Sequence, residues 1–466
     1  MSSQPRSVPT VGAATAGLAA VAVLGGMAWA IGHTSYDVWG GLLIGPLLAL
    51  FTLPLIFHTT ARLDGPRAAR LMLYGFGAKL VGAFLRYAVA FELYSGAADA
   101  NQYHGRGRAV ADALRHGDFS FAQANQAGGT GTKFLRGVTG VVYTFTGPSK
   151  LGGFMVFTWL SFLGLYCFYR AFRTALPEGD FLRYGRLLFF LPSMVFWSSS
   201  IGKEAWMTFT LGLAALGTAR VLRSRKGGFV LTAVGLGAAA AVRPHIAVIA
   251  FGGLVVAYAF RRGRTGAPTA AVFKGVGLVI LVVVGALLLR QASGFFNVEE
   301  LDATTVESVL DSTAERTSVG DSHFSAQPVK SPLDIPRAGL SVLFRPFPWE
   351  AGNVQSLVAA MEGLFLLALT ALSARRWIHI GKVRRLRSYV DFAAVYVLLF
   401  VVAFSSIGNF GILVRQRVQV LPFGLVVLAL PFARRGASGT LDALADADTD
   451  PDELDDDERA VPLGLR

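Results

Sequence analysis

Residues 187–222 read LLFFLPSMVFWSSSIGKEAWMTFTLGLAALGTARVL, two apolar runs on either side of Gly202-Lys203-Glu204. A membrane-spanning helix needs about 20 apolar residues, because the hydrocarbon core is about 30 Å thick. A charged side chain inside that core costs about 2.5 kcal/mol or more. The stretch therefore predicts two short helices that Gly202 separates, with both charges at the end of a helical hairpin.

The rest of the chain repeats this pattern. Its 466 residues are 53% hydrophobic and 16% charged, and the mean hydropathy is +0.50. A buried core helix would explain one apolar run, but not many runs that short basic loops separate. We expect an all-α, polytopic transmembrane helical bundle in the cell membrane, in contact with membrane lipids. About twelve spans are predicted, near residues 9–31, 38–57, 71–93, 150–170, 187–201, 205–222, 228–242, 246–260, 272–290, 354–373, 388–408 and 411–432.

Lys and Arg residues predict how these spans are oriented. Five short connections contain 3, 4, 4, 4 and 6 basic residues, in the order 58–70, 170–186, 220–226, 261–274 and 375–387. When the predicted spans are counted along the chain, all five connections fall on the same side of the membrane. Loops rich in Lys and Arg stay in the cytoplasm. Both termini are therefore predicted to be cytoplasmic, with the first span an uncleaved anchor. Two long loops, about 94–149 and 291–353, are predicted on the extracytoplasmic side.

Charge also separates a tail from the transmembrane domain. Residues 436–466 contain ten acidic residues and two arginines, whereas the whole chain has a net charge of +13. We expect a transmembrane domain over 1–435 and a disordered acidic cytoplasmic tail over 436–466. The basic excess of the remainder lies in short loops between apolar runs, which indicates membrane topology and not a nucleic-acid partner.

Candidate functional residues gather at the predicted extracytoplasmic ends of the spans. In SGAADANQYH, Asp99 and Tyr103 share a helix face by their spacing, and Asp99 is suited either to capping a helix or to accepting a proton from a hydroxyl group. Glu204 suits a helix N-terminus, but Lys203 is placed against the helix dipole. A bound phosphate would explain this lysine; so would a side chain that reaches the interface or pairs with a carboxylate.

Three further motifs lie at the same predicted surface. In AAAVRPHIAV, Arg243 and Pro244 suit the end of one helix and the start of the next, and His245 is a candidate proton-transfer group. In LFRPFPWEAGN, the side chains of Arg345, Trp349 and Glu350 suit a sugar ring and a phosphate, although Trp is also typical of the membrane interface. In GNFGILVRQRVQV, Arg415 and Arg417 enter the last span, where arginines usually face an aqueous path.

Together these residues predict one extracytoplasmic vestibule in which cations outnumber carboxylates, and therefore an anionic ligand. The candidate catalytic acids are Asp99, Glu204 and Glu350. The candidate substrate and phosphate ligands are Tyr103, Lys203, Arg243, His245, Arg345, Trp349, Arg415 and Arg417. No spacing of His, Cys, Asp or Glu indicates a metal ion, and we expect no cofactor.

With this architecture and the early-loop acid in SGAADANQYH, the chain resembles the GT-C class of integral-membrane glycosyltransferases and the related bacterial polysaccharide polymerases. The resemblance implies transfer of a sugar from a polyprenyl-phosphate-linked donor to a cell-envelope glycan or lipid acceptor, as in polysaccharide biosynthesis. Asp99 would match the family's early-loop acid and act as the base. In this chain it follows the third predicted span and not the first, and the paired acids of many relatives are absent.

Two other interpretations remain open. A secondary transporter or lipid-glycan flippase also commonly has about twelve spans with both termini inside, and TARLDGPRAAR (residues 60–70) is faintly similar to a loop motif of major facilitator transporters. A carrier, however, concentrates its polar residues near the bilayer midplane. The third interpretation is a membrane scaffold without enzymatic activity.

Overall fold

The computed structural model describes residues 24–96, 99–126, 130–261, 283–291, 322–326, 328–377 and 388–430, with a few single positions between them. Over these residues the protein is helical, apart from turns and one isolated bridge between His323 and Asn409. The all-α prediction is therefore confirmed for the described chain. The tail after residue 435 and most of the predicted spans 9–31 and 272–290 lie outside it.

Four helical segments are long and apolar enough to cross a membrane: Tyr36–Leu93, Lys150–Ala175, Lys203–Leu222 and Val354–Leu372. A fifth is possible if Phe410–Arg417 and Leu421–Leu428, which meet at 61°, form one broken span. Several membrane-compatible helices are thus present, but the predicted twelve spans are not confirmed. Three of those spans form helices of only 13, 16 and 17 residues: α11 (Gly228–Ala240), α12 (Pro244–Ala259) and α19 (Ser388–Phe404).

The first long segment is a hairpin around the helix α7 (Lys150–Ala175). Helix α2 (Tyr36–Pro54) and a π-helical turn (Leu55–Thr60) run alongside α7, since Asp37 contacts Lys150 and Asp64 contacts Arg173. Gly65, with φ of 83°, then reverses the chain. Helix α3 (Ala61–Ala88), continued by Val89–Leu93, returns to the starting end of α7.

The next apolar run ends before Gly202, as the sequence predicted, but the predicted span 187–201 is not one helix. Helix α8 (Phe181–Phe190) ends before Pro192, the five-residue α9 (Pro192–Phe196) follows, and α10 begins at Lys203. Helix α10 (Lys203–Leu222) packs closely on α7, because a Cβ atom on Gly212 would lie 2.2 Å from the carbonyl oxygen of Gly164. Small residues allow such close approach between membrane helices.

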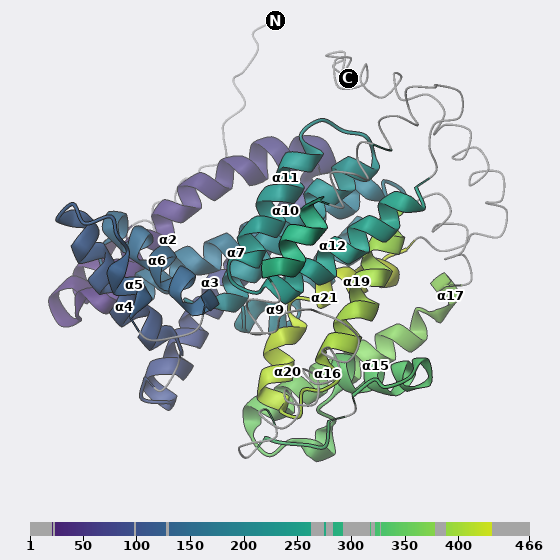
Figure 1. The fold of residues 1–466 in the computed structure, drawn as a ribbon. Helices are drawn as coiled ribbons and strands as arrows, with labels where there is room; N and C mark the ends of the chain where they lie inside the picture. The colour runs from purple at the N-terminus through teal and green to yellow at the C-terminus, as the bar shows by residue number, and fades with distance from the viewer. Residues whose placement is uncertain are drawn as a thin grey trace, which may run out of the picture.

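The first predicted loop, 94–149, is a folded unit. It contains α4 (Asp99–Arg115), α5 (Ala122–Asn125) and α6 (Thr130–Thr146), which lie together at one side of the bundle (Figure 1). The apolar stretch 138–145 within this loop is the second half of α6, which packs on α4. The hairpin therefore covers the starting end of α7.

The described part of the second loop also folds. It contains the turn Pro332–Asp334, α15 (Ile335–Phe344) and the turn Pro348–Glu350, which lead into α16 (Val354–Leu372) and α17 (Ala374–Trp377). Helices α20 (Phe410–Arg417) and α21 (Leu421–Leu428) complete the described chain. Helices α15, α16 and α20 lie near one another at the lower end of the molecule in Figure 1.

Predicted basic segments meet at one end of the bundle. Asp64 pairs with Arg170 and Arg173, and Asp180 lies 3.9 Å from Arg376. These contacts bring the segments 58–70 and 170–186 together with the described start of the segment 375–387, residues 375–377. The starts of α7 and α10 lie at the opposite end, where Gly153 lies against Ile201.

Candidate functional site

A cavity of about 450 Å³ lies at this opposite end, where several helices begin or end. It is bounded by the end of α3, the start of α4, the connection from α9 to α10, the start of α16 and helix α20. Six residues that the sequence proposed line it: Asp99, Tyr103, Lys203, Glu204, Arg243 and Arg415. The polar side chains therefore come from segments far apart in the sequence.

The wall around Lys203 follows directly from the local sequence. Gly202 precedes α10, so Lys203 and Glu204 form its first turn. The Glu204 carboxylate accepts a hydrogen bond of 3.1 Å from the Arg243 guanidinium. Arg243 is the residue before α12, and Pro244 is the first residue of that helix, as the sequence predicted. Glu204 is therefore neutralised by a partner, and its availability as a base is reduced.

Asp99 differs from Glu204 in its surroundings. It begins α4 with its side chain 75% exposed, and its nearest cation, Arg415, is 3.5 Å away. Tyr103 lies one turn further along α4 and is buried. Burial, followed by the negative charges of Glu204 and Asp99, raises the pKa of Tyr103 to about 12. Near neutral pH its phenol is a hydrogen-bond donor beside an accessible carboxylate.

The cavity contains one important residue that sequence reasoning missed. Arg86, near the end of α3, lies over the ring of Trp197 at 4.9 Å and over Phe196 at 5.0 Å. Arg415 approaches the Trp197 ring at 5.5 Å. Within the part of the chain that the structure describes, the buried Nε atoms of both arginines have no hydrogen-bond partner. An arginine inside a predicted span is itself a functional signal, and it could have identified Arg86.

Two unpartnered guanidinium donors beside one indole ring are suited to an oxyanion. Guanidinium groups bind phosphate and carboxylate through paired N–H donors. The cation–π contacts hold both side chains in place at modest cost. The cavity therefore offers an anion four nearby cations, Arg86, Lys203, Arg243 and Arg415, against two carboxylates.

Five of the predicted residues do not line the cavity. Arg345 pairs with Glu350 and stacks on Phe324 at 4.3 Å, and Arg417 donates to the Arg345 carbonyl oxygen. This segment supports the cavity from behind, because Arg345 also lies 5.2 Å from Phe410, which is a lining residue. The remaining two are Trp349, which is 79% exposed and whose ring stacks on Phe347, and His245, which lies beside Phe404.

The vestibule expected from the sequence is consequently smaller than predicted. Glu350 has its charge satisfied by a neighbouring arginine, and Arg417 is buried and does not line the cavity. Side chains from the LFRPFPWE motif lie against one another because the Arg345–Glu350 pair closes a tight corner between α15 and α16. No residue of this motif therefore lines the cavity.

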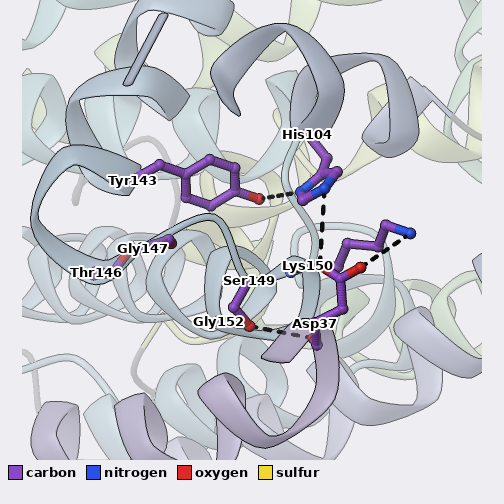
Figure 2. Close-up of polar contacts among 8 residues, drawn as sticks. All are labelled: Asp37, His104, Tyr143, Thr146, Gly147, Ser149, Lys150 and Gly152. Carbon is purple, nitrogen blue, oxygen red and sulfur yellow. Dashed lines mark hydrogen bonds and ion pairs between the residues drawn. The ribbon is translucent and has the colours of Figure 1, made fainter. Parts of the chain in front are cut away.

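A second polar cluster anchors the α4–α6 hairpin to the bundle. Figure 2 shows Asp37 between His104 and Lys150, with Tyr143 on the other side of His104. The Tyr143 hydroxyl lies 2.9 Å from His104 Nδ1, Asp37 lies 3.8 Å from His104 Nε2, and Lys150 lies 3.3 Å from Asp37 (Figure 2). The cluster joins α2, α4, α6 and α7, and so fixes the helix that carries Asp99 and Tyr103.

Burial dominates the acid–base properties of His104. It lowers the pKa of the imidazole, with further lowering by Lys150 and Arg108 and an opposing effect from Asp37. A buried imidazole of this kind is neutral near pH 7. In that state Nδ1 accepts a hydrogen bond from the Tyr143 hydroxyl, and the Nε2–H group faces the Asp37 carboxylate.

Among the described residues, no group of three or more His, Cys, Asp or Glu side chains is placed to hold a metal ion. Comparison with known proteins adds no family: no family model, no curated protein and no solved structure matches the chain. Its function is inferred from the chemistry of the cavity itself.

Proposed function

We propose that this protein is a membrane glycosyltransferase that moves a sugar from a polyprenyl-phosphate-linked donor to a cell-envelope glycan or lipid acceptor on the extracytoplasmic side. The observation that carries the proposal is the pair of guanidinium groups from Arg86 and Arg415 beside the Trp197 ring, whose Nε atoms have no hydrogen-bond partner among the described residues. A phosphate leaving group requires such donors, because its charge develops as the glycosidic bond breaks.

The cavity's charges divide into two functional parts. Glu204 and Arg243 neutralise each other at 3.1 Å. Arg86, Lys203 and Arg415 then form an excess of positive charge opposite Asp99, whose side chain is largely exposed. An anionic donor is attracted to this surface, while Asp99 remains accessible to a neutral hydroxyl.

Asp99 is the proposed general base. As the acceptor oxygen attacks the anomeric carbon, its proton passes to the Asp99 carboxylate. The bond from that carbon to the phosphate oxygen breaks, and its electron pair stays on the phosphate. Arg86 and Arg415 stabilise that charge, and Lys203 adds to the field. Tyr103, whose phenol keeps its proton near neutral pH, is positioned to donate a hydrogen bond to the sugar or acceptor.

A lipid-linked donor is favoured by the apolar surfaces beside the cavity. On α3, Val81 and Leu85 are exposed below Arg86, and on α16 Val358 and Met361 are exposed below the cavity rim. Exposed apolar helix faces of this kind are compatible with contact to lipid chains. The basic segments lie at the other end of the bundle, which supports a cavity on the extracytoplasmic side and cytoplasmic termini.

A second candidate function, a transporter or flippase for a lipid-linked glycan, is favoured by the broken helices. The α8–α9 break and the 61° bend between α20 and α21 resemble the discontinuous helices that bind substrates in carriers. Helix α20 and the turn that follows α9, each next to one of these breaks, contribute lining residues to the cavity. A flippase would move the lipid without breaking the glycosidic bond.

One experiment separates the two functions. The purified protein is reconstituted in liposomes with polyprenyl-phosphate sugars that carry a radiolabel in the sugar. The proposal predicts release of unlabelled polyprenyl phosphate and transfer of the label to an added glycan acceptor. Movement of intact labelled lipid between leaflets without bond cleavage would support the flippase. No transfer across a panel of hexose and pentose donors would refute the glycosyltransferase.

A further inference from the structure

Helix α9 is a five-residue helix held at both ends by buried ionisable side chains from other helices. At its start, Glu362 of α16 accepts hydrogen bonds from the Ser193 backbone N–H at 2.7 Å and from the Ser193 hydroxyl at 2.5 Å. At its end, Lys79 of α3 donates to the Met194 carbonyl oxygen at 3.1 Å and to the Ser198 carbonyl and hydroxyl oxygens at 3.1 and 2.9 Å. Lys79 is 0% exposed and Glu362 is 6% exposed.

The signs of these charges match the helix ends. A helix leaves unpaired N–H groups at its start and unpaired carbonyl groups at its end, which carry partial positive and negative charge respectively. In a membrane interior those groups must be satisfied by protein. Glu362 supplies the acid at the start of α9 and Lys79 supplies the cation at its end. Three acceptors also match the three donors of an ammonium group.

Both side chains are linked to the cavity through their own helices. Lys79 and Arg86 lie seven residues apart on one face of α3, which is about 10.5 Å along the axis. Between them, a Cβ atom on Gly82 would lie 2.3 Å from the Val195 carbonyl oxygen, so α3 lies directly against the α9 backbone. Glu362 is one turn beyond Ala359, which lines the cavity.

Helix α9 leads directly into the cavity wall. Trp197, Ser200, Gly202 and Lys203 follow it within seven residues and all line the cavity. A shift of α9 would move the indole ring away from Arg86 and change where α10 begins. The two buried charges thus determine where the cavity's anion-binding groups lie, although neither lines the cavity.

We propose that Lys79 and Glu362 are positioning residues that fix α9 and thereby set the geometry of the anion site. This proposal rests on the proposed function in one respect, which is that the cavity is taken as the site where the ligand binds. Loss of either charge leaves one end of α9 with buried unpaired groups, and the segment 197–203 then opens more often. The role of Asp99 as the base does not change, but in fewer molecules does the cavity keep the arrangement seen in the structure.

The test uses a Ser200→Cys substitution in the full-length protein as a reporter thiol, labelled with N-ethylmaleimide in detergent and quantified by peptide mass spectrometry. Native Cys167, in the middle of α7, reports loosening elsewhere in the same molecule. We expect Lys79→Met and Glu362→Met, which remove the donors and acceptors at each end of α9, each to raise the labelling rate of the reporter thiol about tenfold, which corresponds to about 1.4 kcal/mol. The rate at Cys167 should stay within twofold. The matched control is Thr158→Val, a buried substitution in α7.

A labelling rate of the reporter thiol that stays within twofold in both variants would overturn the proposal, as would an equal rise at Cys167. Should Lys79→Met not fold, Ser193→Ala removes one hydrogen bond to Glu362 and is expected to give a smaller rise, about threefold. Inorganic pyrophosphate provides the independent arm. Protection of the reporter thiol by pyrophosphate, with Lys79 and Glu362 intact, supports the anion site. If pyrophosphate does not protect the reporter thiol, the result counts against the proposed function. The labelling rates of the Lys79 and Glu362 variants still decide whether these residues have a positioning role.

Discussion

Replacement of Asp99 by Asn separates the role of this residue in catalysis from its role in stability. Two unit charges 3.5 Å apart in water interact by about 1 kcal/mol. The Asp99 side chain is 75% exposed, so salt screens this pair further. Exposed ion pairs contribute about 0.2–1 kcal/mol to folding. Asp99→Asn should therefore change the free energy of unfolding by less than about 1 kcal/mol.

The chemical effect should be far larger. An amide cannot accept the acceptor's proton, and loss of a general base reduces a rate by about 100- to 10,000-fold. That range corresponds to about 2.7–5.4 kcal/mol in the activation barrier. We therefore expect kcat for sugar transfer to fall by at least about 100-fold while thermal unfolding is almost unchanged.

The assay is single-turnover transfer of radiolabelled sugar from a polyprenyl-phosphate donor, together with thermal unfolding of the same preparations. Asp112→Asn is the matched control, because Asp112 lies on the same helix, α4, and outside the cavity. It should retain the parent rate. The reasoning is refuted if Asp99→Asn keeps more than about a tenth of the rate, or if its activity falls only in proportion to lost folded protein.

Three further predictions concern the cavity and its support. Glu204→Gln and Arg243→Met should each destabilise the protein by up to about 3 kcal/mol, since each leaves a buried partner unpaired. Chemical denaturation of the double variant should show a loss of stability smaller than the sum of the two single losses. Additive losses would contradict the pairing. Arg86→Met should weaken the binding of inorganic pyrophosphate by about 10- to 150-fold. This corresponds to the loss of one charged hydrogen bond of about 1.5–3 kcal/mol. Isothermal titration calorimetry measures the Kd, and an unchanged Kd would show that Arg86 is not part of the anion site. His104 has a lowered pKa in the folded protein, so its contribution to stability is present above its unfolded pKa, about 6.5, and is lost as the pH falls through the folded value. Hydrogen exchange of α4, corrected for intrinsic rates, should therefore increase on acidification from pH 7.5 to 5 in the parent and much less in His104→Gln; equal pH dependence in both would contradict this.

Local sequence was sufficient to predict the helical class and several helix boundaries. Gly202 and the charges after it correctly predicted that a helix begins at Lys203, and Pro244 was correctly expected in the first turn of the helix that is α12. Asp99 was correctly expected at the start of a helix. These features are local, because the conformational limits of Gly and Pro and the charge preferences of helix ends act within a few residues.

The number of membrane spans was less predictable. Apolar runs such as 228–242 and 388–408 form helices, but these are shorter than the runs that predicted them. Hydropathy records how apolar a segment is, and a buried helix next to other helices has the same composition as a lipid-facing one. The run 187–201 is divided at Pro192, where Pro cannot continue the hydrogen-bond pattern of the preceding helix.

What the sequence alone determined is the helical class, the break at Gly202 and the clustering of charges at helix ends. Only the tertiary structure decided which charges share a cavity. Asp99 and Arg415 are 316 residues apart and meet there, while Arg345 and Glu350 are five residues apart and satisfy each other outside it. Lys79 and Arg86 acquire their roles only because α3 lies against α9. Helix periodicity specifies which side of a helix is polar, but the packing of distant helices determines what that side contacts.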